Sequence, residues 1–166
     1  MYQVEREQIV EFARRASATG LSIGTSGNIS ARVDAGVLIT PSGRDADTTM
    51  PADLCLVDVD GFQVDGAFRP SSELPMHLAV YHRTDAAAVV HTHSPYATAL
   101  SVVLDELPAV HYTINGLGGP VRVAPYATFG SPELAEHITG ALDQRTAAIL
   151  QNHGTVADRK STRLNS

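Results

Sequence analysis

The chain has 166 residues, a length typical of one domain that buries its own core without disulfides. Its formal net charge is -6, and its basic residues form no cluster before the last eight positions, so nucleic acid and anionic membranes are poor partners. Cys55 is the single cysteine, and no apolar leader or membrane-spanning run is evident, so we expect a cytoplasmic protein without disulfides.

The first part of the chain combines one helix with short strands. Residues 5–19 carry a helical apolar stripe that ends at Gly20, which predicts a packing helix. The glycine-rich segment 24–30 is either an ordinary loop or a ligand-binding loop, and it matches neither the Walker nor the dinucleotide fingerprint. Strands are predicted at 37–40, 54–59 and 62–64.

Residues 70–81 predict a helix whose N-terminus could contact a ligand. Ser71 or Ser72 can cap this helix, and free amides and serine hydroxyls at a helix start favour anions. Glu73 would lie at the same end, either as an acid favoured by the helix dipole or as a metal ligand or base. We expect His77 to support Glu73 or the backbone by a hydrogen bond rather than to bind a metal.

Two apolar runs end in histidines. Residues 86–90 predict a buried strand that leads to His91 and His93, and residues i and i+2 of a strand share a face. A second buried strand at 147–150 leads to His153. Three imidazoles at two strand ends would leave the fourth position of a tetrahedral zinc centre open for a carboxylate, a water or a substrate.

The His-x-His pair is weak evidence by itself, because satisfied or exposed histidines are common. No acidic residue follows within residues 95–101, where a cupin or a metallo-hydrolase site would need one. A completing ligand therefore has to come from elsewhere in the chain.

The remaining elements are predicted as helix 95–103, strand 107–112, flexible loop 116–119, strand 121–123 and helix 132–142 capped by Ser131. Together with the earlier elements they indicate a mixed α/β domain.

Several separated segments, taken together, resemble the class II aldolase/adducin family. They are Gly24-Thr25-Ser26-Gly27-Asn28, Thr40-Pro41-Ser42-Gly43, Pro70-Ser71-Ser72-Glu73, His91-Thr92-His93, Ala124-Pro125-Tyr126-Ala127-Thr128-Phe129-Gly130 and Asn152-His153-Gly154. Their joint order over about residues 7–157 is more specific than any single motif. The resemblance implies a three-layer α/β/α domain over residues 1–158, with a central mostly antiparallel sheet covered by helices on both sides.

Residues 159–166 resemble no part of this family and look like a foreign tail on a domain that is incomplete at its C-terminus. We therefore expect this chain to be impaired in turnover.

The resemblance also implies site residues. His91, His93 and His153 match zinc ligands, one ion per subunit, and Glu73 matches the residue that completes the coordination and then serves as acid and base. Positions that hold the substrate phosphate are matched by Gly27, Asn28, Ser42, Gly43, Ser71 and Ser72. Tyr112 matches a catalytic tyrosine that reaches a neighbouring subunit's site in a homotetramer.

The implied activity is that of a lyase of carbohydrate metabolism. It would cleave a ketose 1-phosphate, such as L-fuculose 1-phosphate, to dihydroxyacetone phosphate and an aldehyde, with zinc in place of a Schiff-base lysine. Alternatives are an L-ribulose-5-phosphate 4-epimerase, which resembles this segment with aspartate in place of Glu73, and a methylthioribulose-1-phosphate dehydratase. A non-enzymatic, adducin-like interaction module is the alternative from another class, and retention of all four metal-site residues argues against it.

Overall fold

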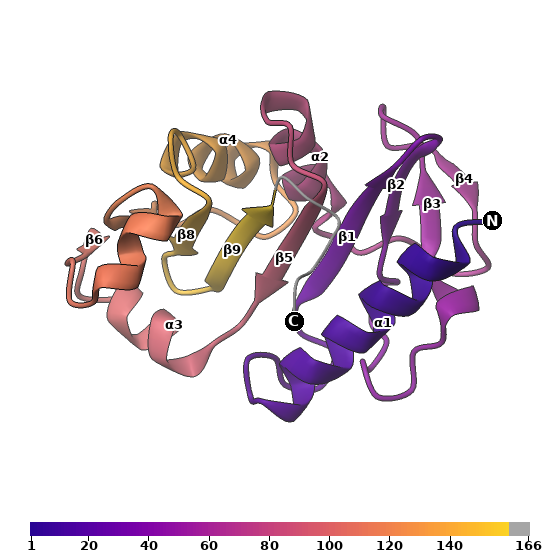
Figure 1. Ribbon diagram of the computed structural model, residues 1–166, viewed down its shortest axis with the longest axis horizontal. Helices are drawn as coiled ribbons and strands as arrows, with labels where there is room; N and C mark the ends of the chain where they lie inside the picture. Colours follow the sequence, from indigo (N-terminus) through magenta and orange to yellow (C-terminus); the bar gives the residue numbers. More distant parts are fainter. Residues whose placement is uncertain (160–166) are drawn as a thin grey trace.

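The computed structural model describes residues 1–159, and these form a nine-stranded sheet flanked by helices (Figure 1). The strand order is β4-β3-β2-β1-β5-β9-β8-β7-β6. Neighbouring strands are antiparallel except for β7 and β8, which are parallel. The bounds are β1 Asn28–Val33, β2 Gly36–Ile39, β3 Cys55–Val57, β4 Gln63–Asp65, β5 Ala88–Thr92, β6 Glu106–Leu107, β7 Val121–Ala124, β8 Ala147–Leu150 and β9 Gly154–Arg159.

Helices cover both faces of the sheet, as expected for a three-layer domain. On one face, α1 (Gln3–Ala18) packs on β1 and β2, while α3 (Pro95–Ser101) packs near β8 and β9. On the other face, α2 (Leu74–Arg83) and α4 (Pro132–Ala141) pack against each other (Figure 1). Short 3₁₀ helices span Pro51–Asp53 and Tyr112–Leu117. No helix among the described residues has the length and apolar character needed to cross a bilayer.

The core is divided by the sheet, because successive residues of a strand point to opposite faces. Val37 and Leu150 belong to the cluster under α2 and α4, whereas their neighbours Leu38 and Ile149 belong to clusters on the opposite face. Each buried strand therefore contributes to two apolar layers, which explains why the runs 37–40, 86–90 and 147–150 are almost continuously apolar.

Two strands that the sequence did not predict, β1 and β9, flank the central strand β5. Segment 24–30 is a loop only up to Gly27, and β1 begins at Asn28. In β1 the side chains of Ile29 and Ala31 face α1, whereas Asn28 and Ser30 lie on the α2 face. A buried strand is predicted from a run of apolar residues, and the polar residues at buried positions of β1 interrupt that run.

The predicted strand 107–112 is wrong. Strand β6 ends at Leu107, since the next residue, Pro108, has no backbone N–H to donate to a ladder. The chain then forms the 3₁₀ helix Tyr112–Leu117, which also replaces part of the predicted loop 116–119. The other predicted helices and strands are present with shifted ends, and Ser131 caps α4 through its side chain as expected.

The segment 159–166, which we expected to be a foreign tail, lies mainly outside the described residues. Arg159 is the last residue of β9 and is paired with Ala88 of β5, whereas residues 160–166 lie outside the part that the structure describes.

Candidate metal centre and phosphate pocket

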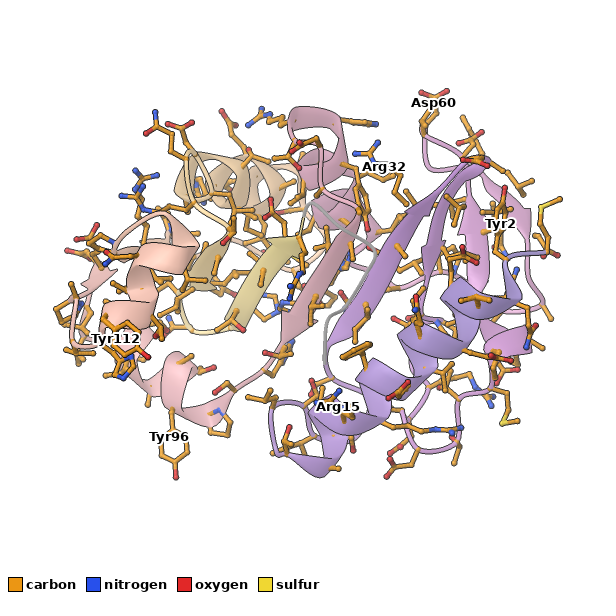
Figure 2. The ribbon with its side chains drawn as sticks, in the orientation of Figure 1. Tyr2, Arg15, Arg32, Asp60, Tyr96 and Tyr112 are labelled. Carbon is orange, nitrogen blue, oxygen red and sulfur yellow. The ribbon has the colours of Figure 1, made fainter. Side chains whose placement is uncertain are left out.

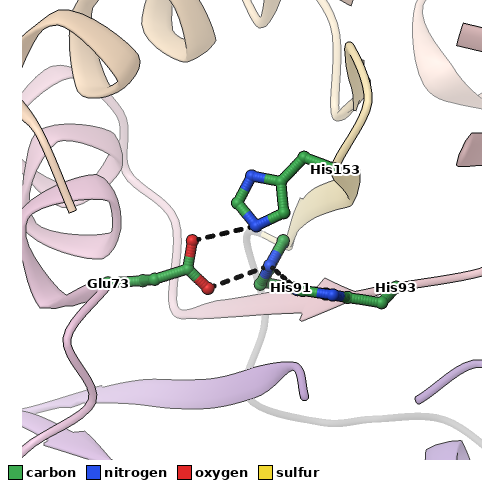
Figure 3. Close-up of side chains that lie close together, drawn as sticks. All are labelled: Glu73, His91, His93 and His153. Carbon is green, nitrogen blue, oxygen red and sulfur yellow. Dashed lines mark hydrogen bonds and ion pairs between the residues drawn. The ribbon is translucent and has the colours of Figure 1, made fainter. Parts of the chain in front are cut away.

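The structure brings three histidines and one glutamate to a single point at the end of the central strands (Figure 3). His91 lies on β5, His93 follows that strand, His153 lies in the turn between β8 and β9, and Glu73 precedes α2. The imidazole centroids are 4.7 to 4.8 Å apart. One ligand atom from each of the four residues lies within 4.8 Å of all the others.

The donor atoms converge in a way that fits a divalent cation. The Nε2 atoms of His91 and His93 are 2.9 Å apart, and His91 Nε2 lies 3.0 Å from Glu73 Oε2. Glu73 Oε1 is buried and accepts no hydrogen bond of regular geometry, although His153 Nε2 lies 3.2 Å away. Nitrogen and carboxylate donors that face one another at these distances form the N/O ligand set of zinc-like metals.

The protonation state of these side chains favours metal binding, which needs neutral imidazoles and an ionised carboxylate. Burial, together with the neighbouring histidines, lowers the pKa of His93 to about 4 and also lowers that of His153. Burial would raise the pKa of Glu73, but hydrogen bonds and charge from His91, Asn28 and His153 outweigh it and lower that pKa to about 2. At neutral pH, lone pairs are therefore free on both imidazoles and the carboxylate is charged.

A backbone contact from β9 orients the imidazole of His91 on β5. The Nδ1–H of His91 donates to the carbonyl oxygen of Thr155 at 2.9 Å, which leaves the Nε2 lone pair directed at the cluster. The hydroxyl of Thr155 also lies 2.8 Å from that of Thr92. Neither contact was predicted, because β9 was not recognised as the neighbour of β5.

The turn that carries His153 is fixed by α3. Asn152 adopts a left-handed conformation with φ 56°, and its backbone N–H donates to the Ser101 hydroxyl at 2.9 Å. The Thr98 hydroxyl donates to the carbonyl oxygen of His153 at 3.3 Å. Asn is one of the few residues that adopt this conformation readily, so the Asn-His-Gly sequence suits a turn that directs one imidazole inward.

A pocket of about 360 Å³ opens directly over this cluster. Its lining includes all six positions expected to hold a phosphate, namely Gly27, Asn28, Ser42, Gly43, Ser71 and Ser72. Thr25, Ser26, Tyr126, Phe129 and Asn152 also line it, although none of these was predicted as a site residue. Lysine and arginine are absent from the described lining, so an anion there would be held by amides and hydroxyls.

Two predicted contacts at the start of α2 are wrong. Glu73, rather than Ser71 or Ser72, occupies the N-cap position, and the Ser71 hydroxyl accepts the N–H of Glu73 at 3.2 Å. The side chain of His77 bonds neither Glu73 nor the backbone, but contacts Asn28 and Ser30 of β1. The helix begins four residues later than predicted, so its first turn lies beyond both serines.

Tyr112 lies away from the pocket in this chain. Tyr112 is 79% exposed at the molecular surface (Figure 2). Its ring contacts that of His111. A role for Tyr112 in a neighbouring subunit's site stays a prediction.

Comparisons with known proteins agree with this fold. A model of the Class II Aldolase and Adducin N-terminal domain matches residues 7–161. The chain belongs to the class II aldolase and adducin family. It is 42% identical to the 5-deoxy-D-ribulose 1-phosphate aldolase of Bacillus thuringiensis serovar kurstaki, over 99% of this chain and 78% of that protein. It is also 42% identical to the L-fuculose phosphate aldolase of Escherichia coli K12, over 90% of this chain and 70% of that protein.

A solved structure of L-fuculose 1-phosphate aldolase has the same fold. It superimposes with a TM-score of 0.89 and 38% identity, over 94% of this chain and 75% of that one. These relatives are class II aldolases, which are metal-dependent lyases. The Glu73 and histidine cluster could bind that metal.

Proposed function

We propose that this protein is a zinc-dependent aldolase that cleaves a ketose 1-phosphate to dihydroxyacetone phosphate and an aldehyde. The observation that carries the proposal is that one pocket combines a three-histidine and glutamate cluster with a cradle of amides and hydroxyls. The first would hold a cation and the second a phosphate, and the substrate of such an aldolase has to engage both.

We assign His91, His93, His153 and Glu73 as metal ligands, because their donor atoms already converge. A bound divalent cation would stabilise the negative charge that develops on the ketose oxygens as the carbon-carbon bond breaks. The residues Gly27, Asn28, Ser42, Gly43, Ser71 and Ser72 would hold the phosphate and so fix which carbon of the sugar faces Glu73.

Glu73 is assigned as the acid and base. In the cleavage, the bond between C3 and C4 breaks, the C4 hydroxyl loses its proton to form the aldehyde, and C3 gains a proton. Glu73 is the one acidic side chain in the described pocket lining. It would leave the metal as the substrate binds, take up a proton and deliver it at C3. The exposed Tyr112 would act on the aldehyde side in a neighbouring subunit of a homotetramer.

Two sugars lead the candidates for the substrate, because relatives of 42% identity are named for 5-deoxy-D-ribulose 1-phosphate and L-fuculose phosphate. The test incubates zinc-loaded protein with both ketose 1-phosphates and measures dihydroxyacetone phosphate release. Glu73→Gln, which keeps the side-chain shape but removes the charge, is expected to reduce release at least about 100-fold.

Other outcomes would point to the alternatives. Interconversion of pentulose phosphates without release would favour the epimerase, and loss of water from methylthioribulose 1-phosphate would favour the dehydratase. A folded protein that binds no divalent metal would indicate the adducin-like module instead.

A further inference from the structure

A continuous chain of polar side chains runs through the core from α2 to the metal cluster. The Tyr81 hydroxyl lies 2.8 Å from the Ser30 hydroxyl, which lies 2.6 Å from His77 Nδ1. His77 Nε2 lies 2.5 Å from Asn28 Oδ1, and Asn28 Nδ2 lies 3.0 Å from Glu73 Oε2. The exposed fraction is 8% or less for each of these five residues and zero for His77 and Ser30.

The chemistry of Glu73 fixes the direction of every bond in this chain. A carboxylate can only accept, so the Asn28 amide has to present its NH₂ group to Glu73 and its oxygen to His77. His77 must then donate from Nε2, which makes Nδ1 the acceptor of the Ser30 hydroxyl proton. Ser30 in turn accepts from Tyr81, and all donors point toward Glu73.

Burial keeps His77 in the neutral state that this direction requires. Burial, reinforced by nearby His91 and opposed by Glu73, lowers the pKa of His77 to about 3. A neutral imidazole has one N–H and one lone pair, so the two contacts of His77 use both. Buried polar groups are costly unless they are satisfied, and both ring nitrogens of His77 have a partner.

The pairing of β1 with β5 brings this chain of polar side chains to the metal cluster. Asn28 of β1 pairs with His91 of β5, so the amide lies beside a metal ligand on the α2 face of the sheet. His77 lies one helical turn after Glu73, but its side chain is linked to the Glu73 carboxylate through Asn28. Asn28 also lines the pocket, so its orientation bears on both the phosphate cradle and the glutamate.

We propose that His77 is a positioning residue that locks the Asn28 amide and thereby holds the Glu73 carboxylate toward the three histidines. The inference rests on the metal site of the proposed function. Its consequence is that metal affinity and the geometry of the metal site depend on a fully buried histidine that binds neither metal nor substrate.

The test uses cobalt as a visible probe of coordination in His77→Gln and His77→Asn. A glutamine amide can place its N–H where Nε2 lies and keep the bond to Asn28, whereas the shorter asparagine reaches only the position of Nδ1. We expect His77→Gln to keep the cobalt spectrum, and His77→Asn to change it and to weaken cobalt binding about 10- to 100-fold. His82→Gln, at an exposed position of the same helix, is the control.

A measurement on the unsubstituted protein covers the case in which a variant does not fold. Nitrogen-15 NMR should show His77 as the Nε2–H tautomer, and an Nδ1–H tautomer would overturn the inference. A folded His77→Asn with the cobalt spectrum and affinity of the unsubstituted protein would overturn it as well. If the unsubstituted protein takes up no cobalt, the metal centre of the proposed function is itself wrong.

Discussion

Replacing Gly154 by alanine should push apart two parts of the proposed metal site. A Cβ atom at Gly154 would lie only 2.1 Å from the carbonyl oxygen of Thr92 and 3.2 Å from the Cα of His93. Carbon-oxygen contacts need about 3.3 Å, so the strands β5 and β9 would have to move apart by about 1 Å. Gly154 does not have a positive φ, so alanine adds a steric clash without backbone strain.

His93 directly follows β5, and His153 directly precedes β9. Metal sites tolerate distance errors of about 0.2 Å, so a shift of about 1 Å should weaken metal binding at least about 10-fold. Overpacking of this kind should also lower the free energy of unfolding by about 1 to 3 kcal/mol.

The assay is competition for zinc with a chromophoric chelator, combined with urea unfolding of the metal-free protein. Gly140→Ala is the matched control, because Gly140 lies in α4 with no atom within 4 Å of an added Cβ. It should leave zinc affinity unchanged and raise stability by up to about 1 kcal/mol. Zinc affinity in folded Gly154→Ala equal to that of the control would refute the steric argument.

Three further predictions concern burial. Ser101→Ala leaves the N–H of Asn152 without its acceptor and should lower the free energy of unfolding, measured in urea, by about 1 to 3 kcal/mol. An unchanged value would contradict the role of α3 in fixing the turn that carries His153. Burial raises the pKa of Cys55 to about 11, so iodoacetamide should label it near neutral pH only after unfolding, and rapid labelling of folded protein would argue against this packing. The pKa of His77 is lowered from 6.5 to about 3, so the unfolded state binds a proton that the folded state rejects between these values. Stability of the metal-free protein should be unaffected by this group above pH 6.5 and should fall below it, by about 1.4 kcal/mol per pH unit, whereas His77→Gln should lack this component.

The sequence predicted the elements whose buried faces are apolar. The runs 37–40, 86–90 and 147–150 became strands β2, β5 and β8, because both faces of these strands pack against apolar layers. Strands β1 and β9 were not predicted, because polar residues interrupt their apolar pattern. Asn28 and Ser30 lie on the α2 face of β1, and Thr155 lies near the start of β9. Each of them bonds to another polar group. Hydrogen-bonded polar residues in a core give no periodic apolar signal.

The site shows the same division between local and long-range information. The residue pattern indicated that His91 and His93 share a face and that His153, at a second strand end, could be a third ligand, whereas it was the family resemblance that joined Glu73 to them. The contact of His77 with Asn28 depends on the pairing of β1 with β5, which joins segments about sixty residues apart and leaves no local trace. Residues that act through such pairings become visible only in three dimensions.

The position of β9 between β5 and β8 has a consequence for biosynthesis. This strand is the last described element to leave the ribosome, yet it fills a gap in the middle of the sheet and supplies the carbonyl that orients His91. A nascent chain that stops before Gly154 would expose the unpaired edges of β5 and β8 and could not assemble the ligand cluster. Metal uptake should therefore be a late event that reports completion of the sheet.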